Sequence, residues 1–310
     1  LDILAQGGGI LSTVRMTRQA SEDALVQKAG AALEEMLSLG VTTCEAKSGY
    51  GLDRQTELKQ LAVIRRLGRT QPVELAATYL GAHAVPEEYK ACRDEYIRLM
   101  TEEMIPLVAR EGLAEFCDVF CETGVFTASE SEQILGAALA HGLKVKIHTD
   151  EIDAIGGTEL AGALSAVSAE HLIAATDRGI AALAKGGTVA VLLPATSFYL
   201  GKPYARARDM IAAGVPVAVA SDFNPGSCPS LNLQLVMNLA CWNYRLTPEE
   251  VLTAATLNAA AAICRADRLG SLEVGKQADL VIWDAPDLDY ICYRVGSNLA
   301  DTVIKRGVIV

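Results

Sequence analysis

The chain has 310 residues, of which 51% are apolar, with a formal net charge of −11 and a sequence pI near 4.9. Its length allows one large barrel-sized domain or two ordinary domains, each with a substantial core. The acidic charge leaves no basic face for phosphates, which excludes nucleic acid and anionic membranes as expected partners. With no leader-like or membrane-length apolar segment, and eight cysteines but no Cys-x-x-Cys pair, we expect a cytoplasmic protein.

Helical periodicity alternates with short β-rich runs from Ser21 onward, which predicts βαβ units and a parallel sheet. We expect one helix from a Ser21 cap to Leu39, and another that begins at Thr247. Seven strands are predicted, at residues 41–46, 73–80, 116–121, 143–148, 168–172, 188–193 and 215–220. An α/β barrel has eight, but residues 7–9 and the polar stretch after them are typical of a loop.

The pattern changes near Arg265. A turn at 270–276, a strand at 278–284 and a hairpin within 301–310 predict a small β appendage. We therefore expect a (β/α) barrel over residues 1–266 that lacks its first strand, and a separate β unit over residues 267–310.

Three of the later predicted strands end in residues that suit a metal centre. His148 ends strand 143–148 and Glu151 follows it, as a metal ligand with an acid/base group beside it would. His171 lies in strand 168–172, and Asp222 follows strand 215–220. Each has a simpler interpretation, as an edge histidine, a hydrogen-bonded structural histidine and a helix cap respectively.

Two earlier strands deliver polar side chains to the same rim. His83 follows strand 73–80, and Tyr50 lies in the loop after strand 41–46. Because the carboxyl ends of barrel strands share one rim, the five strand ends together predict a metal site, and two histidines with an aspartate suit Zn²⁺ or Fe. We expect a structural hydrogen-bonding role for Glu122, and His141 as a helix C-terminal cap.

Four stretches, at residues 47–52, 80–86, 147–151 and 221–227, closely resemble the signatures of the imidazolonepropionase family of the amidohydrolase superfamily. The resemblance runs in the same order from Gly7 to the C-terminus. It implies a (β/α)₈ TIM barrel with a small β-sandwich, one Zn²⁺ or Fe³⁺ ion and a homodimer. It also implies hydrolysis of the ring C–N bond of 4-imidazolone-5-propanoate to N-formimino-L-glutamate in histidine degradation.

By motif, the resemblance implies His148 and Asp222 as metal ligands. It implies Glu151, His171 and Asp222 as catalytic groups that hold or activate water. The implied substrate contacts are Tyr50, His83, Glu151, Asn224, Gly226 and Ser227. Arg15 and Arg18 are candidates for binding the substrate's propionate.

The sequence departs from the family in two places. The superfamily's His-x-His pair of metal ligands occurs nowhere in it, so we expect the first barrel strand and the N-terminal sandwich strands to be absent. Thr149 replaces the usual Ala, which should be tolerated if its hydroxyl has a partner. Two alternatives stay open: another cyclic amidohydrolase or deaminase on the same scaffold, and a non-catalytic truncated barrel.

Overall fold

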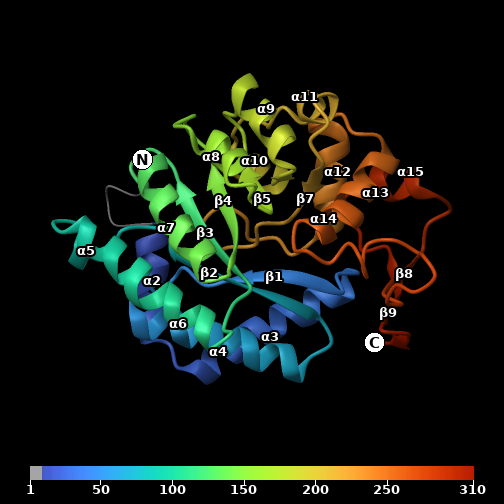
Figure 1. The fold of residues 1–310 in the computed structure, drawn as a ribbon. Coiled ribbons are helices and arrows are strands. Elements are labelled where there is room, and N and C mark those ends of the chain that lie inside the picture. Colours follow the sequence, from blue (N-terminus) through green and yellow to red (C-terminus); the bar gives the residue numbers. More distant parts are fainter. Residues whose placement is uncertain (1–8) are drawn as a thin grey trace.

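A computed structural model describes residues 9–310, in which seven parallel strands form one curled sheet in sequential order (Figure 1). All seven predicted strands are confirmed, with ends within two residues of those expected. They are β1 (Thr43–Lys47), β2 (Glu74–Ala82), β3 (Phe116–Cys121), β4 (Lys144–Thr149), β5 (Ser168–His171), β6 (Val189–Leu192) and β7 (Val217–Val219). Every neighbouring pair is parallel, so all carboxyl ends meet at one rim.

Helices connect the strands and pack against the sheet (Figure 1). Up to β5 they are α2 (Ile10–Gln19), α3 (Glu22–Ser38), α4 (Arg54–Thr70), η1 (Glu87–Tyr89), α5 (Arg93–Arg98), η2 (Leu99–Met104), α6 (Ile105–Arg110), α7 (Ala128–Ala140) and α8 (Gly157–Ala163). After β5 they are α9 (Asp177–Gly186), α10 (Pro194–Leu200), α11 (Ala207–Ala212), α12 (Leu233–Asn243), α13 (Pro248–Ala255), α14 (Leu257–Ala261) and α15 (Leu288–Tyr293).

The expected helix caps are confirmed. The Ser21 side chain accepts a hydrogen bond from the Ala24 backbone, and Thr247 forms a capping box with Glu250. His141 is the C-terminal cap of α7. These local signals explain why helix starts were predictable.

The expectation of a loop after Gly9 is wrong, because α2 occupies residues 10–19. Much of this segment is polar, but Val14 and Thr17 lie on one buried side of the helix, while Arg15 and Met16 face solvent. Packing against the rest of the protein therefore stabilises a helix that composition alone does not indicate. Residues 7 and 8 of the predicted glycine loop lie outside the described part of the chain.

Alternation along β3 and β4 separates two faces of the sheet. Cys117 and Val119 are fully buried in the main apolar core, as are Val145 and Ile147. The intervening residues include Asp118, whose ion pairs lie on the opposite face. This inner face is therefore charged, although the strands are buried.

A separate antiparallel sheet follows the barrel helices. It consists of β8 (Leu280–Trp283), β9 (Ala300–Lys305) and β10 (Val308–Ile309), in the order β10-β9-β8. The strand expected within 278–284 and the hairpin expected within 301–310 are both confirmed.

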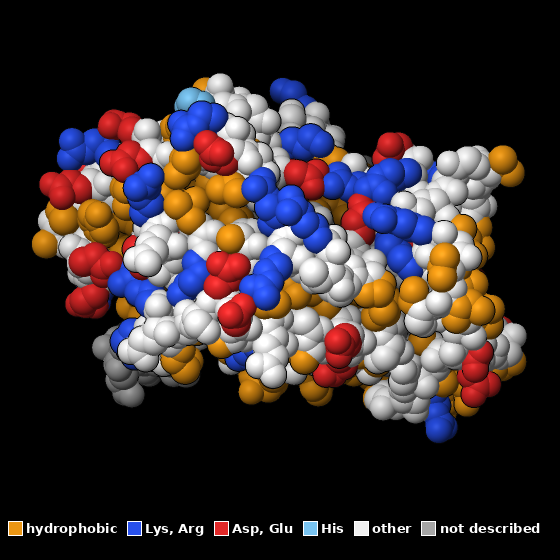
Figure 2. All heavy atoms as spheres, turned by 90° about the horizontal axis from the view of Figure 1, so that it is seen from below, with side chains coloured by type: hydrophobic (Ala, Val, Ile, Leu, Met, Phe, Trp, Pro, Cys, Tyr) orange, Lys and Arg blue, Asp and Glu red, His pale blue; other side chains and the backbone are white. Residues whose placement is uncertain are grey.

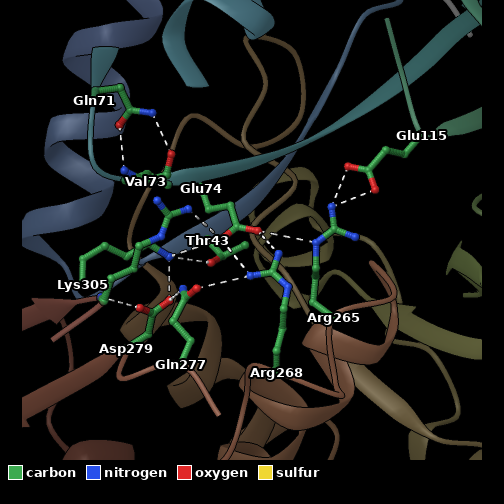
Figure 3. A network of polar contacts seen from close by, with 11 residues as sticks. Thr43, Gln71, Val73, Glu74, Glu115, Arg265, Arg268, Gln277, Asp279 and Lys305 are labelled. Carbon is green, nitrogen blue, oxygen red and sulfur yellow. Dashed lines mark hydrogen bonds and ion pairs between the residues drawn. The ribbon is translucent and has the colours of Figure 1, made fainter. Parts of the chain in front are cut away.

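A network of ion pairs centred on Glu74, the first residue of β2, joins the two sheets (Figure 3). Glu74 binds Arg268 directly and lies 3.7 Å from Lys305 Nζ of β9. Lys305 Nζ also lies 2.6 Å from Asp279 Oδ2, and both of these side chains are buried. The cationic side chains outweigh the effect of burial and lower the pKa of Glu74 to about 2.

The surface carries both charge types. On the face seen in Figure 2, Lys and Arg side chains lie among Asp and Glu side chains. No helix in the described part of the chain is long and apolar enough to cross a membrane.

Candidate functional site

The loop after β1 is built around the buried carboxylate of Glu57. It accepts hydrogen bonds from the backbone N–H groups of Gly49, Gly51 and Leu52 at 2.8–3.2 Å. Burial raises the pKa of Glu57, while these hydrogen bonds lower it. One side chain thus fixes the loop that presents Tyr50 at the rim.

His83 lies directly against this loop. Its Nδ1 is 2.9 Å from the Gly49 carbonyl, and its ring centroid is 5.0 Å from that of Tyr50, edge to face. Burial lowers the pKa of His83 to about 4, more than the Gly49 contact raises it. The imidazole is therefore neutral at physiological pH, able to donate one hydrogen bond and accept another.

His148, at the end of β4, contacts a buried ion pair. Its Nδ1 lies 2.9 Å from Asp118 Oδ2, and the same oxygen lies 2.8 Å from Lys47 Nζ. The N–H direction of Nδ1 misses the carboxylate, so the atom has no aligned hydrogen bond despite the short distance. Burial opposes the imidazolium, but Asp118 outweighs it and raises the pKa of His148 to about 9.

A second layer of charge lies next to this pair. Lys146 Nζ is 2.6 Å from Glu45 Oε2 and 3.5 Å from Glu170 Oε1. The other oxygen of Glu45 is 2.7 Å from Lys47 Nζ. Burial works against the charge, yet Lys146 and Lys47 lower the pKa of Glu45 to about 2. The inner face thus holds a continuous ladder of alternating charges across β1, β3, β4 and β5.

The predicted catalytic pair Glu151 and His171 comes together beside His148. His171 Nε2 lies 3.7 Å from Glu151 Oε2, and the His171 and His148 rings are 5.3 Å apart. Glu122 holds the loop in place, accepting hydrogen bonds from the backbone N–H groups of Ile152 and Asp153. The structural role expected for Glu122 is confirmed.

The residue that departs from the family pattern is accommodated. Thr149 donates a 2.7 Å hydrogen bond to Asp150 Oδ1, and Thr158 donates to the other oxygen at 2.6 Å. The Thr149 hydroxyl therefore has a partner, as its tolerance requires.

Asp222 follows β7 in a loop that Asn224 organises. Thr196 donates a 2.9 Å hydrogen bond to Asp222 Oδ2. Asn224 Oδ1 accepts from the Gly226 and Ser227 backbones, and its Nδ2 donates to the Asp222 carbonyl. The Asn224 amide is thus engaged within the loop, while Gly226 remains exposed.

Two further observations tie these segments to one rim. Burial raises the pKa of Tyr50 and lowers that of His83, the carboxylate of Asp222 raises both, and the neighbouring His148 lowers that of His83 further. Asp150, His171 and Asp222 adopt positive φ values of 53°, 72° and 53°. Such backbone conformations are uncommon outside glycine and cluster at functional sites.

The candidate arginine Arg18 lies beside the loop after β1. It lies 2.8 Å from both the Gly51 carbonyl and Asp53, and 2.7 Å from Glu88. Arg15 is exposed on α2.

The chemistry of this rim fits a metal ion. Among the described residues, Asp118, His148 and Glu170 offer ligand atoms within 4.8 Å of one another. Buried atoms without an aligned hydrogen bond also gather here, namely His148 Nδ1, His171 Nδ1 and Glu170 Oε2. Buried polar atoms are rarely left without partners, which points to a further group at this rim.

Sequence reasoning missed Lys47, Asp118, Lys146 and Glu170 as parts of the site. A signal was present, because the period-two alternation of a strand places each of these charged residues on the side of the sheet opposite its immediate strand neighbours. Charges within buried strands are seldom tolerated without partners. The partners, however, come from four different strands and could not be paired from the sequence.

The chain matches the model of the Amidohydrolase family over residues 4–310. It is 54% identical over 312 residues to the imidazolonepropionase of Alkaliphilus metalliredigens, covering 100% of this chain and 74% of that protein. It is also 54% identical over 308 residues to the imidazolonepropionase of Bacillus velezensis, covering 99% and 73%. The chain thus spans about three quarters of the length of these relatives.

Solved structures show the same fold at lower identity. A zinc-bound adenosine deaminase from Xanthomonas campestris matches with a TM-score of 0.71 and 21% identity, over 94% of this chain and 71% of that one. The N-isopropylammelide isopropylaminohydrolase of Burkholderia multivorans matches with a TM-score of 0.74 and 18% identity, over 98% and 80%. At such identities the similarity concerns the fold alone.

Proposed function

Because the chain belongs to the imidazolonepropionase family of amidohydrolases, we propose that it hydrolyses 4-imidazolone-5-propanoate. Water adds across a ring C–N bond to give N-formimino-L-glutamate, a step of histidine degradation. The observation that carries this proposal is the 54% identity to imidazolonepropionases from two organisms across essentially the whole chain. The chemistry of the rim residues is consistent with a hydrolase.

We infer one metal ion, Zn²⁺ or Fe³⁺, with His148 and Asp222 among its ligands. The zinc in the adenosine deaminase neighbour and the unpartnered Nδ1 of the buried His171, whose ring lies 5.3 Å from that of His148, support a metal ion there. When bound, such an ion lowers the pKa of water and stabilises negative charge that develops on the substrate. The His-x-His pair that would complete the family's ligand set does not occur in this sequence.

Proton transfer is assigned to Glu151, His171 and Asp222. As the C–O bond forms, one of these groups accepts a proton from the water, and the departing ring nitrogen receives a proton as the C–N bond breaks. The 3.7 Å separation of His171 Nε2 and Glu151 Oε2 allows the two to exchange a proton with a small movement.

Substrate binding is assigned to the two rim loops. Tyr50 and the neutral His83 form one wall. Because His83 Nδ1 donates to the Gly49 carbonyl, its Nε2 is left to accept a hydrogen bond from a polar ring substrate. Glu151 and the loop of Asn224, Gly226 and Ser227 form the other side. The propionate requires a cation, for which Arg15 or Arg18 is proposed.

The test is hydrolysis of 4-imidazolone-5-propanoate by the full-length gene product, with metal content measured on the same sample. We expect turnover that disappears after chelation and in His148→Ala but persists in His141→Ala, a matched histidine variant at the end of α7. A metal-loaded protein without this turnover would assign the site to another ring substrate. A protein with neither metal nor turnover would support a non-catalytic barrel.

We further propose a homodimer in the cytoplasm, following the family resemblance and the reduced cysteines. Sedimentation of the purified protein tests the oligomeric state.

A further inference from the structure

We propose that Asp118, anchored by Lys47, is a positioning residue that orients the His148 imidazole so that Nε2 faces the metal. This rests on the proposed function, because it assumes that His148 is a metal ligand. Asp118 lies in the middle of β3 and Lys47 at the end of β1. Neither substrate binding nor proton transfer, as proposed above, uses these two charged residues.

Asp118 is held in place by contacts to both of its carboxylate oxygens. Its side chain is 0% exposed in the middle of β3. Oδ1 accepts a 2.8 Å hydrogen bond from the Val119 backbone, and Oδ2 lies 2.8 Å from Lys47 Nζ. A carboxylate fixed at both oxygens is a rigid reference point for a neighbouring ring.

His148 lies directly against that carboxylate. Nδ1 lies 2.9 Å from Asp118 Oδ2, which is hydrogen-bonding distance without hydrogen-bonding alignment. If Nδ1 carries the proton and donates it to this carboxylate, Nε2 is the only nitrogen left to bind a metal. Histidines that bind metals commonly donate their second N–H to a carboxylate in this way, which fixes both tautomer and orientation.

The cations around Asp118 and Glu170 disfavour direct ligation of the ion by these two carboxylates. Asp118, His148 and Glu170 lie close enough together to hold an ion themselves. However, Lys47 Nζ is 2.8 Å from the Asp118 oxygen in question, and Lys146 Nζ is 3.5 Å from Glu170. Ammonium groups at these distances repel a divalent cation strongly in a buried setting. The ion is therefore better placed on the rim side of His148.

Charge balance agrees with this arrangement. The ladder contains three carboxylates, of Glu45, Asp118 and Glu170, and two ammonium groups, of Lys47 and Lys146. Apart from His148 itself, the ladder therefore carries one net negative charge. That charge supports a cation at the imidazole without forming a second cation site.

The test is the Zn²⁺ affinity of full-length protein stripped of metal, measured by competition with a chromophoric chelator. Asp118→Asn should weaken Zn²⁺ binding roughly 10- to 100-fold. It should also change the visible spectrum of the Co²⁺-substituted protein. The matched control is Asp279→Asn, which breaks another buried Asp–Lys pair, 2.6 Å long, at the opposite end of the sheet. It should lower the melting temperature while leaving Zn²⁺ affinity and the Co²⁺ spectrum unchanged.

Unchanged Zn²⁺ affinity in Asp118→Asn would overturn the proposal. Loss of Zn²⁺ binding as complete as in His148→Ala would also overturn it, because it would identify Asp118 as a ligand. Wild-type protein that binds no Zn²⁺ would also overturn it. If only the proposed function is wrong, the result is different. Zn²⁺ binding will still depend on Asp118, but the protein will not hydrolyse 4-imidazolone-5-propanoate.

Discussion

The carboxylate of Glu122 accepts a 2.9 Å hydrogen bond from the backbone N–H of Ile152, the residue that follows Glu151. Its other oxygen accepts from Asp153 and from Thr123. A residue at the end of β3 therefore fixes a catalytic candidate on the neighbouring loop. Rim residues come from different strands, so their relative positions depend on such cross-links.

Glu122→Gln should lower kcat/KM about 10- to 100-fold. The amide nitrogen that replaces one carboxylate oxygen cannot accept a hydrogen bond, so either the Ile152 or the Asp153 N–H loses its partner and the loop carrying Glu151 shifts. Steady-state kinetics with 4-imidazolone-5-propanoate measures the effect. Glu132→Gln, an exposed change on α7, should leave the rate unchanged. Unaltered kinetics in the Glu122 variant would remove the link between this carboxylate and catalysis.

Gly49→Ala should raise KM and destabilise the protein by at least about 1 kcal/mol. Gly49 has a φ of +105°, and an added Cβ would lie 2.8 Å from the Leu80 carbonyl and 3.2 Å from His83 Nδ1. Gly68→Ala is the matched control, because it lies in the α4 helix with open space around it. That change should stabilise by about 0.5–1 kcal/mol. The two free energies of unfolding, measured in urea, should therefore shift in opposite directions.

His83 should contribute to stability at neutral pH and lose that contribution on mild acidification. Its folded pKa is about 4, below the ordinary value of 6.5, so the unfolded chain binds the proton more readily. The contribution is complete above pH 6.5 and falls as pH decreases toward about 4. Allowing for partial exposure, we expect it to reach about 1–2 kcal/mol.

Urea unfolding of wild type and His83→Gln near pH 7 and near pH 5 measures this contribution. The wild type should lose more stability than the variant over that interval, whereas His141→Gln should follow the wild type. Parallel losses in wild type and His83→Gln would contradict a neutral folded His83.

Glu74 should act in a lower pH window. Its folded pKa is about 2 against an ordinary 4.5, so its ion pairs stabilise the protein above about pH 4.5 and are lost as pH falls toward 2. The shift corresponds to at most about 3 kcal/mol. Glu74→Gln should therefore lower the neutral-pH melting temperature and flatten its decline between about pH 4.5 and 2. A decline as steep as that of the wild type would show that other carboxylates dominate acid unfolding.

Local sequence signals predicted the strands and helix caps well. Short apolar runs fixed all seven barrel strands, and Ser21 and Thr247 marked helix starts through hydrogen bonds to residues three positions ahead. Helix α2 was missed because its buried stripe involves few apolar residues and depends on tertiary packing. Local pattern carries little information about such helices.

The candidate site was predictable in part. The order of the predicted strands places His148, His171 and Asp222 at one rim. The charge ladder of Lys47, Asp118 and their neighbours depends on which buried side chains face one another across strands. That relationship follows from sheet register and curl, neither of which a single sequence specifies.

The Glu74 network has a consequence for the order of folding. Arg268 lies 194 residues after Glu74, and Lys305 is later still. Contacts this distant in sequence form slowly, because the intervening chain must be ordered first. During synthesis on the ribosome, β2 would emerge well before the cations that hold its first residue. A nascent chain paused before Arg268 should therefore be protease-sensitive at β2 even if the neighbouring strands have begun to pair.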